Sequence, residues 1–126
     1  MLNEALSLLD ALYPRVVKAS QPAPPASPAE SDCFRVTAGA SGALAGRADS
    51  IAVLIAGDWH FIAPVQGMAL FDAASDHLLV FRSGWKQATG PAAPVGGSVI
   101  DIEARAALAG VMAALRNLGI LATATP

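Results

Sequence analysis

The side chains that could perform metal chemistry in this sequence of 126 residues are two histidines and one cysteine. His60 and His77 fall in separate apolar runs, and Cys33 is distant from both in sequence. A zinc site needs three or four ligands, so these residues do not form a recognisable set. Because each histidine alternates with apolar neighbours, we expect both to occupy solvent-facing strand positions. The sequence therefore predicts neither a metal site nor a cofactor.

Three aspartates, Asp58, Asp72 and Asp76, could supply paired carboxylates for the acid–base hydrolysis of a glycan. Each stands at the end of an apolar run or in a turn, where an Asp side chain typically bonds nearby backbone amides. The serines lack the Gly-x-Ser-x-Gly surroundings of a hydrolase nucleophile, and the GASGALAG stretch lacks the spacing of a phosphate loop. These patterns favour a protein that is not an enzyme, with glycan hydrolysis as the weaker hypothesis.

Aromatic side chains are concentrated in one region of the chain: Trp59, Phe61, Phe71, Phe81 and Trp85. The simplest interpretation is an aromatic core, with Trp59 and Phe61 on one strand face and Phe71 meeting Phe81 across strands. The alternative is that Trp59 or Trp85 is exposed and stacks on a sugar, because an indole covers an apolar sugar face while its N–H bonds a polar group. Trp85 follows a glycine in a predicted turn and is the better candidate for exposure.

Short apolar runs separated by Gly and Asp predict an antiparallel meander of five to six short strands. The expected strands are 33–37, 51–56, 59–63, 68–72, 77–82 and 85–87. The Ala56-Gly57 step predicts a tight hairpin turn in which Gly57 has a positive φ. The Gly- and Ala-rich connection between the first two strands should wrap over the sheet. Cys33 lies within a strand and is predicted to be a buried thiol.

A helix is predicted at each end of the chain. Leu2, Leu6, Leu9 and Tyr13 recur at helical spacing, and Pro14 should end or kink this helix. The second helix should begin at the N-cap Asp101 and end before Gly119. Its expected apolar face consists of Leu108, Val111, Met112, Leu115 and Leu118, and its remaining surface is mostly alanine.

The expected fold class is α+β, a small antiparallel β-meander flanked by N-terminal and C-terminal helices. We expect a helix and short extended segment over 1–20, a Pro-rich spacer over 21–31 and an antiparallel β-domain over 32–87. A Pro/Gly linker over 88–100 and a helix over 101–121 should follow.

The composition predicts a homo-oligomer. Only 14% of the residues are charged and 54% are hydrophobic, whereas about a quarter are charged in an average soluble domain. Spare apolar surface is usually buried against another subunit. The expected contact residues lie on the two helices: Leu2, Leu6, Leu9, Leu108, Val111, Met112 and Leu115.

Charge and hydropathy also predict which partners are absent. A net charge of −2 with scattered basic residues predicts no nucleic-acid binding. No apolar run approaches the roughly 20 residues of a transmembrane helix, so no membrane insertion is expected. Glu4 and Asp10 interrupt the N-terminal apolar stretch, which lacks a basic start. We therefore expect synthesis in the cytoplasm without a signal peptide.

Several segments, in order, resemble the family of domain of unknown function 2793. They are LNEALSLLDAL, PPASPAESDCFRV, GALAG, WHFIAP, GMALFD, LLVFRSGW and GGSVIDIEARAALAGVMAALRNLGI. Two positions depart from the family pattern: Leu44 stands where an aromatic residue is usual, and Ala69, Leu70 and Phe71 stand where a second tryptophan is usual.

The resemblance implies a role in the tail of a phage or gene transfer agent, as a tail-fibre or tail-tip accessory module. It implies a virion component that is a homotrimer, contacts other tail proteins and takes part in host attachment. No catalytic residue carries over from the family. A carbohydrate-binding module for bacterial surface polysaccharide is the alternative function, and the departures at Leu44 and Ala69 to Phe71 weaken it if the family aromatics bind ligand.

Overall fold

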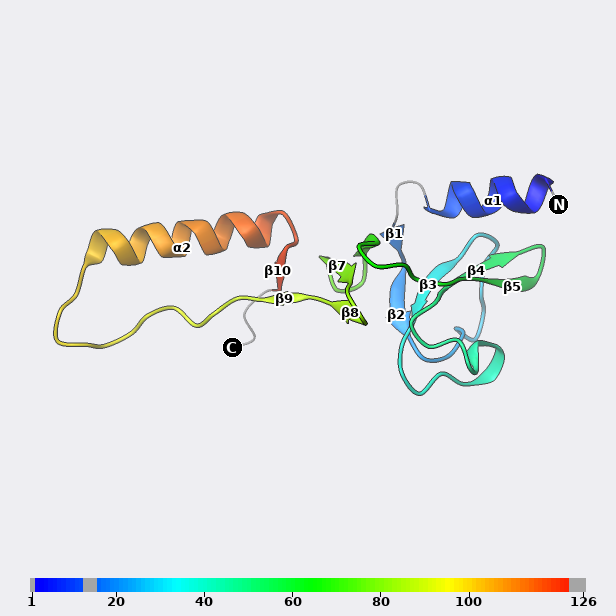
Figure 1. The fold of residues 1–126 in the computed structure, drawn as a ribbon, viewed down its shortest axis with the longest axis horizontal. Helices are drawn as coiled ribbons and strands as arrows, with labels where there is room; N and C mark the ends of the chain where they lie inside the picture. Colours follow the sequence, from blue (N-terminus) through cyan, green and yellow to red (C-terminus); the bar gives the residue numbers. More distant parts are fainter. Residues whose placement is uncertain (1, 13–15, 123–126) are drawn as a thin grey trace.

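The computed structural model describes residues 2–12 and 16–122. The molecule is elongated: α1 (Leu2–Leu12) and one small sheet lie side by side at one end, a second small sheet lies in the middle, and α2 (Ile102–Asn117) extends from the other end (Figure 1). The predicted α+β class, with short antiparallel strands flanked by two helices, is confirmed. The predicted contribution of Tyr13 and Pro14 to the end of the first helix lies outside the described residues.

The strands divide between two four-stranded sheets. One has the order β2-β3-β4-β5, formed by Ala19–Gln21, Cys33–Val36, Ile51–Ile55 and Asp58–Ile62. The other has the order β1-β6-β7-β8, formed by Val16–Val17, Ala69–Asp72, His77–Phe81 and Trp85–Lys86. The six predicted strands correspond to β3 to β8 within one residue at each end. The pairs that these six strands form with one another, β3–β4, β4–β5, β6–β7 and β7–β8, are all antiparallel.

The segment 16–21 belongs to both sheets. Val16 and Val17 pair in parallel with β6, and Ala19 to Gln21 pair in parallel with β3. Parallel neighbours need a crossover connection, and the Pro-rich residues 22–32 provide it between β2 and β3. The segment predicted as a spacer is thus a connection within the β-region, which we call the β-body (residues 16–87).

The main core lies between the two sheets. Val17, Cys33, Ile51, Val53, Leu70 and Leu79 form one buried cluster, to which both sheets contribute. Alternation along β4 directs Ile51 and Val53 into this cluster and Ala52 to the opposite face. Cys33 is only 7% exposed, which confirms the predicted buried thiol, and burial raises its pKa to about 11.

A second, smaller core covers the outer face of the β2-β3-β4-β5 sheet. Val36, Leu44 and Ala52 are fully buried there, under Trp59 and Phe61. Leu44 belongs to a short 3₁₀ turn (Gly42–Leu44) in the connection between β3 and β4, so the prediction that this connection wraps over the sheet is confirmed. Because Leu44 is a core residue, its departure from the family pattern is a change in core packing.

The β4–β5 hairpin turns through Ala56 and Gly57, whose φ values are +52° and +82°. Two consecutive positive φ values identify the tight hairpin turn that matches strand twist. The prediction of a hairpin with Gly57 at positive φ is confirmed.

Residues 88–122 form a separate feature that we call the C-terminal arm. It contains β9 (Ala88–Thr89), an extended stretch, α2 and β10 (Leu121–Ala122), and β10 returns to pair in parallel with β9. Asp101 Oδ1 accepts a hydrogen bond from Ala104 N–H at 2.8 Å, which confirms the predicted N-cap. Gly119 follows the helix with a φ of +72°, as expected for its C-terminal turn.

Candidate functional site

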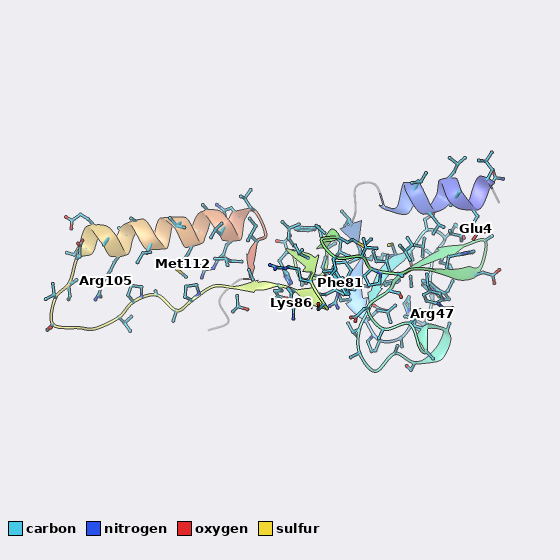
Figure 2. The ribbon with its side chains drawn as sticks, viewed as in Figure 1. Glu4, Arg47, Phe81, Lys86, Arg105 and Met112 are labelled. Atoms are coloured by element: carbon cyan, nitrogen blue, oxygen red, sulfur yellow. The ribbon has the colours of Figure 1, made fainter. Side chains whose placement is uncertain are left out.

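The helix α1 contacts the β-body through one side and presents leucines on the other. Leu8 packs against the main core, and Glu4 Oε1 lies 2.9 Å from His60 Nδ1 on β5 (Figure 2). Leu2, Leu6 and Leu9 are 73%, 55% and 64% exposed. The predicted leucine stripe is therefore an apolar surface that the other described residues leave largely uncovered.

The helix α2 buries none of its residues. One side faces the extended stretch of the arm: Arg105 Nη2 bonds the carbonyl of Gly96, and Met112 and Arg116 lie close to Gly90. Met112 and Leu115 are half-buried, whereas Leu108 and Val111 remain 54% and 57% exposed. The predicted apolar face of this helix thus splits into a side that packs within the arm and a side that faces solvent.

Exposed apolar side chains continue along the extended stretch of the arm. Val95 and Val99 are 88% and 85% exposed, and Ile100 and Ile102 are 59% and 71% exposed. The arm leaves the β-body as a hairpin of one strand-like segment and one helix (Figure 1). It is therefore an apolar projection with little cover from its own chain.

The arm joins the β-body where its helix ends. Leu78 N–H donates to the carbonyl of Gly119 at 2.6 Å. A Cβ on Gly119 would lie 3.0 Å from Phe71 Cε2 and 3.3 Å from His77 Cα. His77 is only 7% exposed and its Nδ1 lies 3.0 Å from the carbonyl of Ser75. The expectation that His77 faces solvent is wrong, because the end of the arm packs over its strand.

The two tryptophans are half-buried, one in each sheet. Trp59 packs on the smaller core and lies 6.1 Å from the ring centroid of Phe34. Trp85 packs on the main core, meets Phe81 edge-on at 5.4 Å and donates its indole N–H to the carbonyl of Asp49 at 2.8 Å. The expected cross-strand partner of Phe81 was Phe71, but Phe71 lies opposite Leu78. The ring of Trp85 is thus held in place, with its polar atom already used.

The three aspartates considered for hydrolysis do not form a constellation. Asp58 begins β5, in a different sheet from Asp72. Asp72 is 3% exposed and accepts hydrogen bonds from the Ser20 hydroxyl and from the amides of Ala74 and Ser75. Burial alone would raise the pKa of Asp72, but these hydrogen bonds outweigh it and lower the pKa below its ordinary value. Asp72 acts as a turn cap and a link between sheets.

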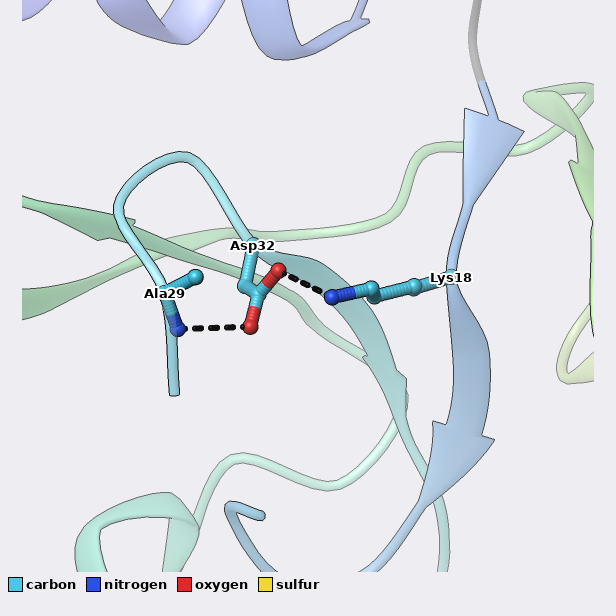
Figure 3. A network of polar contacts seen from close by, with 3 residues as sticks. All are labelled: Lys18, Ala29 and Asp32. Carbon is cyan, nitrogen blue, oxygen red and sulfur yellow. Dashed lines mark hydrogen bonds and ion pairs between the residues drawn. The ribbon is translucent and has the colours of Figure 1, made fainter. Parts of the chain in front are cut away.

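A second buried carboxylate fixes the Pro-rich crossover. Asp32 Oδ1 accepts from Lys18 Nζ at 2.6 Å, and its Oδ2 accepts from Ala29 N–H at 2.8 Å (Figure 3). The Lys18 ammonium and then the Ala29 amide lower the pKa of Asp32. Because Lys18 joins β1 to β2, this contact ties the crossover to the segment shared by both sheets.

An open groove of about 680 Å³ lies beside the β7–β8 turn, and sequence reasoning did not find it. It is lined by Gln66, Gly67, Arg82, Ser83 and Lys86. The lining comes from the turn before β6, the turn after β7 and the end of β8, which the β6–β7 and β7–β8 pairings bring together. Glycines in both turns were the only signal in the sequence, and they did not indicate that the turns meet.

The placement of metal-ligating side chains and the length and hydropathy of the helices bear on metal binding and on membrane insertion. In residues 2–12 and 16–122, no group of three or more His, Cys, Asp or Glu side chains is placed to hold a metal ion. Neither described helix combines the length and the hydropathy required to cross a bilayer.

Comparison with known proteins places the chain in a family. No curated protein matches the sequence significantly. Residues 2–86 comprise α1 and both four-stranded sheets, and the C-terminal arm begins just beyond them. These residues match the family described as "Protein of unknown function (DUF2793)", so the chain belongs to the DUF2793 family.

Proposed function

We propose that this protein is a non-enzymatic structural component of a phage or gene-transfer-agent tail, a tail-fibre or tail-tip accessory that forms a homotrimer. The observation that carries this proposal is the exposure of apolar helix faces at both ends of the molecule. The expectations that the protein belongs to a tail and that it assembles as three copies come from the family resemblance.

Energetics support self-association through these faces. Full burial of one Leu or Val side chain contributes about 1.5–3 kcal/mol, and Leu2, Leu6 and Leu9 each keep more than half of their surface exposed. The helix α2 adds 16 residues, a length of about 24 Å, without a buried residue. Stable interfaces bury roughly 1,200–2,000 Å² in total, an area that two helix faces and an extended apolar stretch can supply.

Light scattering after size-exclusion chromatography tests this assembly. The full chain at tens of micromolar should have the mass of a trimer. Two double variants should lower the mass, because each places charge on one helix face. One combines Leu6→Asp with Leu9→Asp, and the other combines Leu108→Asp with Val111→Asp. These side chains are exposed in the single chain, so circular dichroism should show an unchanged fold.

The matched control is Val65→Asp, which changes a 61% exposed valine on a loop of the β-body. It should leave the trimer intact. A monomeric wild-type chain, or an unchanged mass in both double variants, would contradict the proposal. Mass spectrometry of density-purified particles tests the tail context, and absence of the protein from intact particles would contradict that part.

A second candidate function is attachment to bacterial surface polysaccharide. The observation that favours it is the ring of Trp85, which is half-exposed although its indole N–H is already bonded within the protein. Host capsule or lipopolysaccharide should change the tryptophan fluorescence of the wild type and of Trp59→Phe, and should leave Trp85→Phe unchanged. Flat fluorescence in the wild type would contradict glycan stacking.

A further inference from the structure

The groove beside the β7–β8 turn is built from two turns held in fixed register. Gly67 N–H donates to the carbonyl of Phe81 at 2.8 Å, and Phe81 N–H donates to the carbonyl of Met68 at 2.8 Å. These bonds place Gln66, before β6, opposite the turn that follows β7. The groove therefore has a backbone frame that does not depend on a ligand.

A pair of hydrogen bonds connects the two turns across the groove. Ser83 N–H donates to Gln66 Oε1 at 2.9 Å, and Gln66 Nε2 donates to Ser83 Oγ at 3.1 Å. Ser83 has a φ of +54°, a conformation that costs a non-glycine residue about 1–3 kcal/mol and is often found at functional sites. Within the described residues, the second hydrogen of Gln66 Nε2 and the Ser83 hydroxyl proton remain available as donors.

Two cations stand beside these donors. Arg82 and Lys86 line the groove and are exposed. The ion pairs between described residues, Lys18–Asp32 and His60–Glu4, include neither of them. A Cβ placed on Gly84 would lie 4.0 Å from Lys86 Nζ, so the ammonium group folds back over the turn. Among residues 2–12 and 16–122, those that line the groove include no carboxylate, and the groove is therefore suited to an anion.

We propose that this groove binds the carboxylate of an acidic saccharide. Arg82 and Lys86 would pair with the carboxylate, since charge-assisted hydrogen bonds to carboxylates are the strong ones. Gln66 Nε2 and the Ser83 hydroxyl would bond sugar hydroxyl groups. The net charge of −2 argues against a polyanionic nucleic acid. The inference rests on the glycan-binding candidate above and gives it a site and a ligand class.

The test is a titration of the full chain with tetragalacturonate and, separately, with the neutral galactose tetramer, followed by amide chemical shifts and calorimetry. The acidic oligosaccharide should bind more tightly and shift the amides of Gly67 and Ser83. Arg82→Gln and Lys86→Gln should each weaken binding by about three- to tenfold. Raising the salt concentration should weaken it further, because both cations are exposed.

The sharpest variant is Gln66→Glu. It has nearly the same shape, keeps the oxygen that accepts from Ser83 N–H and places a negative charge in the groove. It should abolish binding of tetragalacturonate. Arg47→Gln is the charge-matched control, because Arg47 lies over the ring of Phe61, away from Lys86 (Figure 2), and it should bind like the wild type.

Four results would overturn the inference. If Gln66→Glu binds tetragalacturonate as well as the wild type does, the groove is not the site. If the neutral tetramer binds as tightly as tetragalacturonate, the ligand class is wrong, but the glycan-binding candidate still stands. If inorganic phosphate competes at the same concentration as the uronate, the ligand class is also wrong. If neither oligosaccharide shifts any amide, the glycan-binding candidate fails as well.

Discussion

Two carboxylates, Asp32 and Asp72, join segments that are far apart in the sequence. Asp72 bonds Ser20, which in turn accepts from Arg35 Nε at 2.8 Å, so one hydroxyl connects β2, β3 and β6. Asp32 connects the Pro-rich crossover to Lys18. Removing one partner of a buried charged hydrogen bond is costly, because the remaining partner is left without a hydrogen bond and without contact with water. These residues therefore determine how the two sheets and the crossover fit together.

The pH dependence of stability tests the role of Asp32. Its pKa in the folded protein is below the ordinary value of 3.8, so the ionised form is the one that the fold stabilises. Its contribution is present above pH 3.8 and is lost as the pH falls through the lower folded-state pKa. Asp32→Asn should reduce the free energy of unfolding by about 1–3 kcal/mol at pH 7, with a smaller difference from wild type at pH 3. Urea unfolding at both pH values measures this.

Asp58→Asn is the matched control, because Asp58 is exposed at the start of β5. It should change the free energy of unfolding by less than about 0.5 kcal/mol at either pH. An equal loss for Asp32→Asn at both pH values would show that shape, and not ionisation, explains its effect.

At the scale of elements, the two helices differ in how they meet the β-body. The helix α1 lies along it, through Leu8 and the Glu4–His60 contact. Beyond the C-terminal end of α2, Gly119 packs over β7 and connects the arm to the β-body. A short contact of this kind depends on backbone approach, so the residue type at position 119 should control it.

Two glycine substitutions in the arm should have opposite effects. Gly119→Ala forces a Cβ against Phe71 and the backbone of His77 at a φ of +72°, and should lower the free energy of unfolding by about 1–2 kcal/mol. Gly110→Ala lies inside α2 with open space around it, and should stabilise the helix by up to about 1 kcal/mol. Thermal unfolding measures both. Hydrogen exchange at the Leu78 amide should accelerate only in Gly119→Ala, and an unchanged rate there would contradict the proposed contact.

At the scale of the whole molecule, the β-body and the C-terminal arm are distinct in their burial. Both buried clusters consist of residues between Val17 and Leu79, with contacts from Leu8 and Trp85. The arm contributes no member to either cluster. The family match also ends at residue 86, at the last residue of β8. We therefore expect the β-body to be the folding unit and the arm to make contacts outside the β-body.

A chain of residues 1–87 should fold without the arm. It keeps both buried clusters and loses the hydrogen bond between Leu78 and Gly119, so its free energy of unfolding should fall by no more than about 2 kcal/mol. Circular dichroism during urea unfolding should show one cooperative transition. If the arm forms contacts between subunits, the shortened chain should also form a smaller assembly than the full chain, as measured by light scattering. A non-cooperative transition would show that the arm is part of the folding unit.

The sequence alone determined the local features of this protein. Period-two alternation, turn residues and caps depend on neighbours along the chain, and they predicted the positions of β3 to β8, the Gly57 turn, the Asp101 cap and the burial of Cys33. Helical spacing likewise predicted that the leucines of α1 share one face, whereas their exposure was decided by how α1 packs on the β-body.

Only the tertiary structure decided which strands share a sheet and which turns meet. The sequence predicted a short extended segment before residue 21 but not its partners, because its parallel pairing with β3 and β6 arises from contacts across the chain. Gln66 meets Ser83, and Gly119 covers His77, for the same reason. These contacts depend on how two sheets pack over a shared core, and no local pattern of residues encodes that choice.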